Sequence, residues 1–319
     1  MISTIQNDDF CLPLVITSQD LLDSRFEFLN NWIKNNKGDI LKKLYKHGAI
    51  LFRGFNIEHA DNFSKLSLSI LDEPSNYRGG DSPRDKINET VYTSTRFPSE
   101  YFIPMHNEKS YSNNYPKLIM FYCFKPALEG GETPLLDGRK LYRLLDKEII
   151  ENFGRKKIKY VQNLHGGYGL GKSWQETFEL TEKGMLEELL KKDNITYFWK
   201  EDDAIRIEEV VNPIVNHPVT NEAAFFSQAD QWHVSHLDEE TRESLKEISN
   251  EDDFYHNSYY GDSSVIEDEY LQSIRNLSKR ESVSFEWKKD DFLLLDNIIT
   301  LHGRNPFKGD RKILVAMGN

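Results

Sequence analysis

Residues 292–304 have the sequence Phe-Leu-Leu-Leu-Asp-Asn-Ile-Ile-Thr-Leu-His-Gly-Arg. The apolar run at its start predicts a buried β-strand, because it is short for a helix and far too short to span a membrane. The strand ends at the polar pair Asp296 and Asn297. His302 follows, just before Gly303, where the backbone can approach a ligand closely. His302 is therefore a candidate metal ligand.

Further runs of strand type occur along the chain, with helical patterns between them. The strand-type runs are residues 49–54, 118–124, 133–136, 158–161, 195–199, 205–211, 282–287 and 312–317. Helices are expected at residues 62–71, 140–153, 181–192, 239–249 and 266–277, and two more within residues 18–46, with a break near residues 37–38. Strands and helices do not alternate regularly. The pattern therefore favours an antiparallel sandwich or barrel with helices packed outside.

The composition is typical of a folded, water-soluble protein. The chain has 319 residues, of which 38% are hydrophobic and 29% charged. No repeat or linker divides it, so a single domain over residues 1–319 is expected, with helical insertions at about residues 145–280. The net charge of −12 argues against binding to nucleic acid or to an anionic membrane. The N-terminus lacks a signal-peptide pattern, and a cytoplasmic location is expected.

The types of side chain present restrict how a metal ion could be bound. Only two cysteines occur, Cys11 and Cys123, and Cys123 lies in an apolar run typical of a core. A metal would therefore be held by histidine and carboxylate groups. The pattern His-x-Asp/Glu occurs at residues 59–61, 106–108 and 236–238. Residues two apart share one face on an extended chain, whereas they diverge on a helix.

This difference favours one of the three pairs. His59 and His236 lie where helices are expected to begin, while His106 follows the extended apolar residues 101–105. His106 and Glu108 are thus the preferred pair, and His302 is the preferred third ligand. Two imidazoles and one carboxylate leave open positions on the metal, an arrangement suited to reactive Fe(II).

Four stretches together resemble the taurine dioxygenase (TauD/TfdA) superfamily of Fe(II)/2-oxoglutarate-dependent oxygenases. They are residues 92–98, 103–111, 130–139 and 296–304. The nearest branch is that of syringomycin-type aspartyl hydroxylases and clavaminate synthase, and the similarity extends from about Arg53 to the C-terminus. It implies an α+β, mainly β fold: a jelly roll, or double-stranded β-helix, with helical insertions and N-terminal helices.

The resemblance also implies roles for individual residues. It assigns Fe(II) to His106, Glu108 and His302, and the carboxylate of the co-substrate 2-oxoglutarate to Thr133 and Arg311. Arginine suits this task because its guanidinium donates two parallel hydrogen bonds. Lys312 stands where some members have a second arginine. Whether residue 311 or residue 312 binds the carboxylate therefore stays open.

Contacts with the substrate itself are expected from residues near these motifs. Arg304 directly follows the His302-Gly303 pair and is placed to meet an anionic group. Weaker candidates, each of which also fits a plain turn or a surface charge, are residues 77–80, Arg84 and residues 94–96.

The implied reaction uses O2 and 2-oxoglutarate, releases succinate and CO2, and hydroxylates an unactivated C–H bond. The nearest branch suggests an amino acid, free or tethered to a carrier protein, in the biosynthesis of specialised metabolites such as antibiotics. Glu108 favours hydroxylation over halogenation, because related halogenases lack this carboxylate so that chloride can bind. Desaturation, epoxidation or ring formation can use the same ligands.

Two alternatives stay open. Residues 166–173 match the phosphate-binding pattern Gly-x4-Gly-Lys-Ser of nucleotide hydrolases, which needs a buried strand before it and a helix after it. The lysines in residues 158–161 and the poor helix-forming sequence of residues 174–180 count against this function. The other alternative is a jelly-roll binding module without activity, and the three intact iron-ligand candidates count against it.

Overall fold

The computed structural model describes residues 12–75, 84–169 and 171–319. Cys11 and the predicted substrate contacts at residues 77–80 lie outside these ranges. The helices are α1 (Ser18–Leu21), α2 (Phe26–Asn35), α3 (Lys37–His47), α4 (Ala60–Ile70), α5 (Gly138–Leu144), α6 (Lys147–Lys156), α7 (Trp174–Phe178), α8 (Lys183–Lys192), α9 (Ala229–Trp232), α10 (Glu239–Ile248) and α11 (Asp268–Glu281), with the 3-10 turns η1 (Glu201–Asp203), η2 (Val234–His236) and η3 (Glu251–Asp253).

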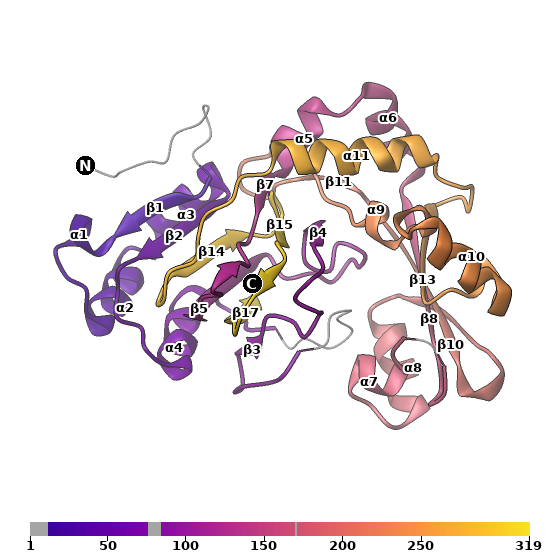
Figure 1. Ribbon diagram of the computed structural model, residues 1–319, viewed down its shortest axis with the longest axis horizontal. Coiled ribbons are helices and arrows are strands. Elements are labelled where there is room, and N and C mark those ends of the chain that lie inside the picture. Colours follow the sequence, from indigo (N-terminus) through magenta and orange to yellow (C-terminus); the bar gives the residue numbers. More distant parts are fainter. Residues whose placement is uncertain (1–11, 76–83, 170) are drawn as a thin grey trace.

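The strands form several sheets (Figure 1). They are β1 (Leu14–Thr17), β2 (Ala49–Arg53), β3 (Tyr92–Thr93), β4 (Ile103–His106), β5 (Leu118–Lys125), β6 (Glu129–Gly130), β7 (Leu135–Asp137), β8 (Ile158–Leu164), β9 (Thr196–Trp199), β10 (Ile205–Val211), β11 (Ile214–Asn216), β12 (Ala223–Phe225), β13 (His256–Tyr260), β14 (Phe292–Asp296), β15 (Thr300–Arg304), β16 (Phe307–Lys308) and β17 (Lys312–Gly318).

The largest sheet has six strands in the order β1-β2-β14-β5-β17-β3. All neighbouring strands in it are antiparallel except β1 and β2, which are parallel. The apolar run that begins at Phe292 is β14, near the centre of this sheet. The mainly antiparallel arrangement predicted from the strand pattern is therefore confirmed.

Alternate residues of these strands face opposite sides of the large sheet, as the two-residue period of a β-strand requires. Phe292 and Leu294 face the outer side, where α2, α3 and α4 cover the sheet. Leu293 and Leu295 face the inner side together with Phe121 and the buried Cys123. The prediction that Cys123 belongs to the core is confirmed, and burial raises the pKa of its thiol to about 12.

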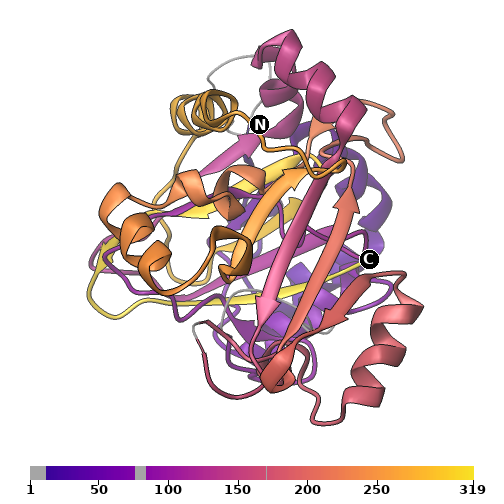
Figure 2. The same ribbon diagram turned by 90° about the vertical axis from the view of Figure 1, so that its right-hand side faces the viewer.

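Two further sheets lie on the inner side of the large sheet. One has the order β4-β15-β7, and the other is the antiparallel sheet β13-β8-β10-β9. Figure 2 shows the long strands β8 and β10 side by side, with α7 and α8 at one end of them. Most of the predicted insertion at residues 145–280 consists of this four-stranded sheet and the helices α6 to α11.

Two of the predicted elements take another form in the structure. The helix expected at residues 140–153 is split into α5 and α6, because Asp146 caps the start of α6 by accepting a hydrogen bond from the Glu148 amide. The strand expected at residues 282–287 is reduced to an isolated bridge between Val283 and Leu135. Among the described residues, no helix is long and apolar enough to cross a membrane.

Candidate metal and co-substrate site

The two candidate histidines meet because their strands pair. β4 and β15 are antiparallel neighbours, and His302 lies directly opposite His106. Opposite residues of an antiparallel pair project their side chains to the same face. The centroids of the two imidazole rings are accordingly 4.4 Å apart. This pairing joins residues that are far apart in the sequence.

Gly303 lets β15 approach β4 closely. A Cβ atom at this residue would lie 2.6 Å from the Ile103 carbonyl oxygen and 3.1 Å from Met105 Sδ. In the structure Gly303 approaches the backbone of β4, and its predicted close approach to a ligand stays a prediction.

Glu108 follows β4 in a loop that Asn297 holds in place. The Asn297 Oδ1 atom accepts a hydrogen bond of 2.8 Å from the Glu108 amide, and its Nδ2 atom donates to the Glu108 carbonyl at 3.0 Å and to the Pro116 carbonyl at 2.7 Å. Asn297 is fully buried. It follows directly after β14, so the central strand of the large sheet fixes the backbone of the Glu108 loop.

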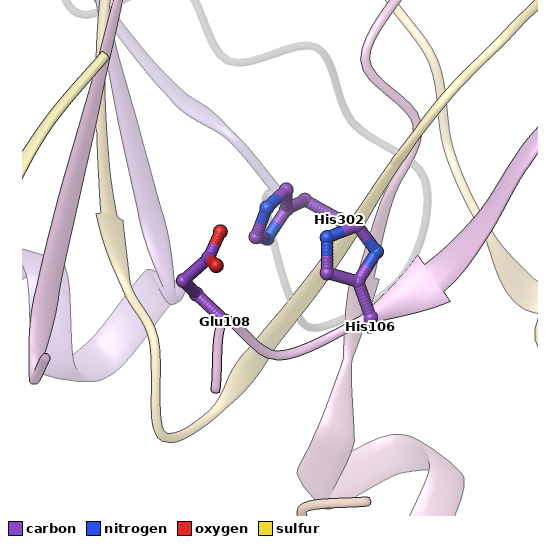
Figure 3. A group of neighbouring side chains, drawn as sticks. All are labelled: His106, Glu108 and His302. Carbon is purple, nitrogen blue, oxygen red and sulfur yellow. The ribbon is translucent and has the colours of Figure 1, made fainter. Parts of the chain in front are cut away.

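The three candidate ligands lie together, as Figure 3 shows. Their potential ligand atoms are all within 4.8 Å of one another, and they are the only such group of three or more among the described residues. His59 and His236, which also belong to His-x-Asp/Glu patterns, lie elsewhere. As predicted, His59 directly precedes α4 and His236 lies two residues before Asp238, the cap of α10.

The protonation states of the cluster suit metal binding. Burial, together with the neighbouring His106 and Arg84, holds the pKa of His302 well below its usual range. Burial alone would raise the pKa of Glu108, but Arg84 and His106 lower it below its ordinary value. A neutral imidazole and an ionised carboxylate are the forms that bind a cation.

The hydrogen bonds of the two rings also fit a metal. His106 Nδ1 lies 2.8 Å from the Pro104 carbonyl oxygen, so this nitrogen carries the proton and Nε2 keeps its lone pair. His302 Nδ1 is buried without a hydrogen-bond partner. Two nitrogens and one carboxylate, without thiolates, match the donor set that suits Fe(II).

Arg84 contacts the cluster directly. Its Nη2 atom lies 2.7 Å from Glu108 Oε2, and the two side chains are only 5% and 6% exposed. From the sequence, Arg84 was only a weaker candidate for a contact with the substrate, and its ion pair with Glu108 was not predicted. The ion pair orients the carboxylate, because Oε2 is engaged by the guanidinium.

A small cavity beside the two histidines contains the predicted co-substrate residues. Its lining includes His106, His302, Thr133 and Arg311, together with Arg84 and residues 94–95. Lys312, by contrast, is exposed and places its Nζ atom 5.0 Å from the centre of the Phe124 ring. Of the two candidates, Arg311 lines this cavity and Lys312 does not, and the contact of Arg311 with 2-oxoglutarate stays a prediction.

Neighbouring groups orient both of the predicted co-substrate residues. Trp287 Nε1 donates to Thr133 Oγ1 at 3.1 Å, which leaves the hydroxyl hydrogen of Thr133 free to be donated. Arg311 Nε donates to the Gly131 carbonyl at 2.9 Å. Gly131 has a φ of 76°, and a Cβ atom there would lie 2.9 Å from Arg311 Cδ, so glycine leaves room for the arginine side chain. The sequence did not indicate the part played by Trp287.

Arg304 lines the same cavity but is already engaged. Its Nη1 atom donates to the Phe97 carbonyl, and its Nη2 atom donates to the carbonyls of Pro98 and Tyr101. These bonds tie β15 to the segment at residues 97–101. The predicted contact of Arg304 with an anionic substrate group stays a prediction.

The loop at residues 166–173 does not have the surroundings of a phosphate site in its described part, on either side of residue 170. The preceding strand β8 is antiparallel to both of its neighbours. The following helix α7 has five residues, and Ser173 and Glu176 form a capping box that occupies its first amides. A phosphate-binding loop needs a longer helix with accessible amides after a buried parallel strand. The nucleotide-hydrolase alternative is therefore not supported.

Known proteins resemble this chain over most of its length. The dapdiamide synthesis protein DdaC of Enterobacter agglomerans is 34% identical over 274 residues, which make up 86% of this chain and 83% of DdaC. A clavaminate synthase-like protein of Arabidopsis thaliana is 24% identical over 292 residues, 89% of this chain and 86% of that protein.

Solved structures share the fold at low sequence identity. PvcB, described as an Fe, alpha-ketoglutarate dependent oxygenase from an isonitrile synthetic pathway, superposes with a TM-score of 0.54 at 14% identity, covering 99% of this chain and 89% of PvcB. An asparagine oxygenase in complex with Fe(II), 2S,3S-3-hydroxyasparagine and succinate gives a TM-score of 0.55 at 12% identity, with 92% and 79% of the two chains covered. The predicted jelly roll is thereby confirmed.

The family match covers nearly the whole chain. Residues 19–317 match the taurine catabolism dioxygenase TauD, TfdA family. This range includes both histidines, Glu108 and the two predicted co-substrate residues. The chain therefore belongs to the TauD/TfdA family and is a dioxygenase that uses Fe(II), 2-oxoglutarate and O2.

Proposed function

We propose that this dioxygenase hydroxylates an unactivated C–H bond of an amino acid or amino-acyl group in the biosynthesis of a specialised metabolite. The observation that carries the proposal is the cluster of His106, Glu108 and His302 beside the cavity that Arg311 lines. The similarity to DdaC, a dapdiamide synthesis protein, supports a biosynthetic role. In this proposal the chain acts as one oxygenase domain and is located in the cytoplasm.

In the proposed site, His106, Glu108 and His302 would hold Fe(II). Bound Fe(II) supplies the activation of O2 that is coupled to oxidation of 2-oxoglutarate to succinate and CO2. Arg311 and Thr133 bind the carboxylate of 2-oxoglutarate that is remote from the metal. Arg311 is half-buried, so its charge is only partly screened by solvent. Glu108 occupies the place that chloride would need, which favours hydroxylation over halogenation.

Arg304 has a second part in the proposal. Its three bonds to backbone carbonyls hold the segment at residues 97–101 to β15. Its Nε–H is buried without a hydrogen-bond partner and could be donated to an anionic substrate group.

The test is succinate formation from 2-oxoglutarate in the presence of Fe(II), O2 and candidate amino acids. His106→Ala and Glu108→Ala are expected to abolish iron-dependent succinate formation while circular dichroism shows an intact fold. Arg311→Lys keeps the charge but loses the two-pronged donor, so the KM for 2-oxoglutarate is expected to rise about 10-fold or more. Undiminished turnover in both alanine variants would contradict the ligand assignment.

A further inference from the structure

A second, larger cavity begins at the residue after Glu108. Its volume is about 230 Å³. Since one water molecule takes up roughly 30 Å³ in the liquid, this cavity has room for a small organic molecule. Lys109 lines it, together with residues from β8, β10, α8 and α9 and with Met317 of β17.

The second cavity adjoins the metal ligands, because the charges of Lys109 and Glu108 are close enough to interact. Ile313 lines the co-substrate cavity and Met317 lines the second cavity, and both project from the inner face of β17. Four residues of a β-strand span roughly 13 Å. Glu108 and Lys109 are adjacent in the chain, so the loop that carries the metal ligand also forms a wall of the second cavity.

Opposite charges face this cavity. Lys109 contributes an ammonium group, and Glu209 of β10 and Asp193 at the end of α8 contribute carboxylates. Glu209 Oε2 accepts hydrogen bonds from Ser112 Oγ at 3.1 Å and from the Asn113 amide at 3.0 Å, which fix its orientation. Burial raises the pKa of Glu209, so a cationic ligand group would stabilise its ionised form.

Aromatic side chains form the apolar wall. Trp232 packs against Tyr111, with ring centroids 4.6 Å apart, and against Tyr160 at 5.2 Å. All three side chains are buried and line the cavity. A cavity that combines such a wall with a few convergent charges is typical of a small-molecule site.

We propose that this cavity binds the head group of a free α-amino acid whose side chain extends toward the metal ligands. Lys109 pairs with the carboxylate of the amino acid, and Glu209 and Asp193 pair with its ammonium group. The inference rests on the proposed function and makes it more specific. A carrier-tethered amino-acyl group carries a thioester in place of the carboxylate and offers Lys109 no anion, so the substrate is a free amino acid.

The test uses the visible charge-transfer absorption of the enzyme with Fe(II) and 2-oxoglutarate under anaerobic conditions. Each standard L-amino acid is titrated into this complex, and the one that perturbs the band most is compared with its carboxamide and its N-acetylcysteamine thioester. In the unaltered enzyme the free acid is expected to bind at least about 10-fold more tightly than either derivative, because each lacks the charge that Lys109 would pair with.

Variants on opposite walls separate the two contacts. Lys109→Met is expected to remove the preference for the free acid. Glu209→Gln is expected to weaken the binding of the acid and of the carboxamide by about the same factor. Lys117→Met, an exposed lysine of the same loop, is the matched control and should leave all three affinities unchanged.

The outcomes distinguish this inference from the proposed function. If the unaltered enzyme forms no band with Fe(II) and 2-oxoglutarate, the proposed function fails. If the band forms but no amino acid perturbs it, if the thioester binds as tightly as the acid, or if Lys109→Met keeps the preference, the inference is overturned. Should Lys109→Met itself form no band, Glu209→Gln decides, and an unchanged affinity for the acid in that variant overturns the inference.

Discussion

Single residues account for how the ligand cluster is assembled. Spacing and local pattern predicted His106, Glu108 and His302, because the two side chains of a His-x-Glu pair on an extended chain lie on one face and can share an ion. Asn297 could not be assigned its part from the sequence, since its bond to the Glu108 amide joins residues 189 positions apart. The same holds for the ion pair between Arg84 and Glu108. Such contacts depend on tertiary packing and leave no local pattern.

Asn297→Ala is expected to weaken Fe(II) binding by about 10-fold to 100-fold, the usual effect of losing a residue that orients a metal ligand. The variant loses the side chain that binds both backbone groups of Glu108, so the carboxylate is no longer held toward the two rings. Anaerobic Fe(II) titration measures the change. Asn113→Ala, on the exposed surface of the same loop, is the control and should bind Fe(II) normally. Equal affinities in the two variants would refute the role given to Asn297.

Elements of secondary structure place the ligands through strand pairing. Most runs of apolar residues were predicted as strands and are strands, because period and residue type are local properties. β15, which carries His302, was not predicted, since Thr300 and Leu301 give it no clear alternation. Its register against β4, which sets His302 opposite His106, is a long-range property. Sequence pattern alone could not supply it.

Gly303→Ala is expected to destabilise the protein by about 1–3 kcal/mol and to weaken Fe(II) binding. The added Cβ atom would meet the Ile103 carbonyl at 2.6 Å and force β15 away from β4. Chemical denaturation and Fe(II) titration measure the two effects. Gly184→Ala is the matched control, because no atom lies within 4 Å of its added Cβ and the residue is inside α8. There the same change should stabilise the protein by about 1 kcal/mol.

The element α9 provides a prediction about pH. Burial raises the pKa of Asp230 to about 7, so the folded protein binds a proton that the unfolded chain has already released. The free energy of unfolding therefore falls as the pH rises from about 4 to about 7. Asp230→Asn removes this cost. The stabilisation by Asp230→Asn should be about 3 kcal/mol larger at pH 8 than at pH 5. The pKa of Asp230 in the folded protein lies about two units above pH 5, and each unit corresponds to about 1.4 kcal/mol.

Urea denaturation at the two pH values tests this effect. Glu151→Gln removes a charge from the exposed surface of α6 and is the control, for which the difference between the two pH values should be near zero. A stabilisation by Asp230→Asn that is the same at pH 5 and pH 8 would show that the Asp230 carboxyl is not the source of the cost.

The molecule as a whole joins three layers around the site. Helices α2, α3 and α4 cover the outer face of the large sheet, and its inner face carries the sheet with β4 and β15. The sequence predicted the antiparallel, mainly β class and, through its family resemblance, the jelly roll. The order of the strands and the cavity next to Lys109 depend on contacts between distant segments. These layers bring two histidines and one glutamate together, and we propose that the three side chains hold a single metal ion.

Anaerobic titration of the enzyme with Fe(II) in the presence of 2-oxoglutarate tests this shared metal site most directly. We expect a visible charge-transfer band that saturates at one Fe(II) per chain, and its loss in His302→Ala. The band should be unchanged in His59→Ala, which alters an exposed histidine of another His-x-Asp pattern. A band of full intensity in His302→Ala would show that His302 is not a metal ligand.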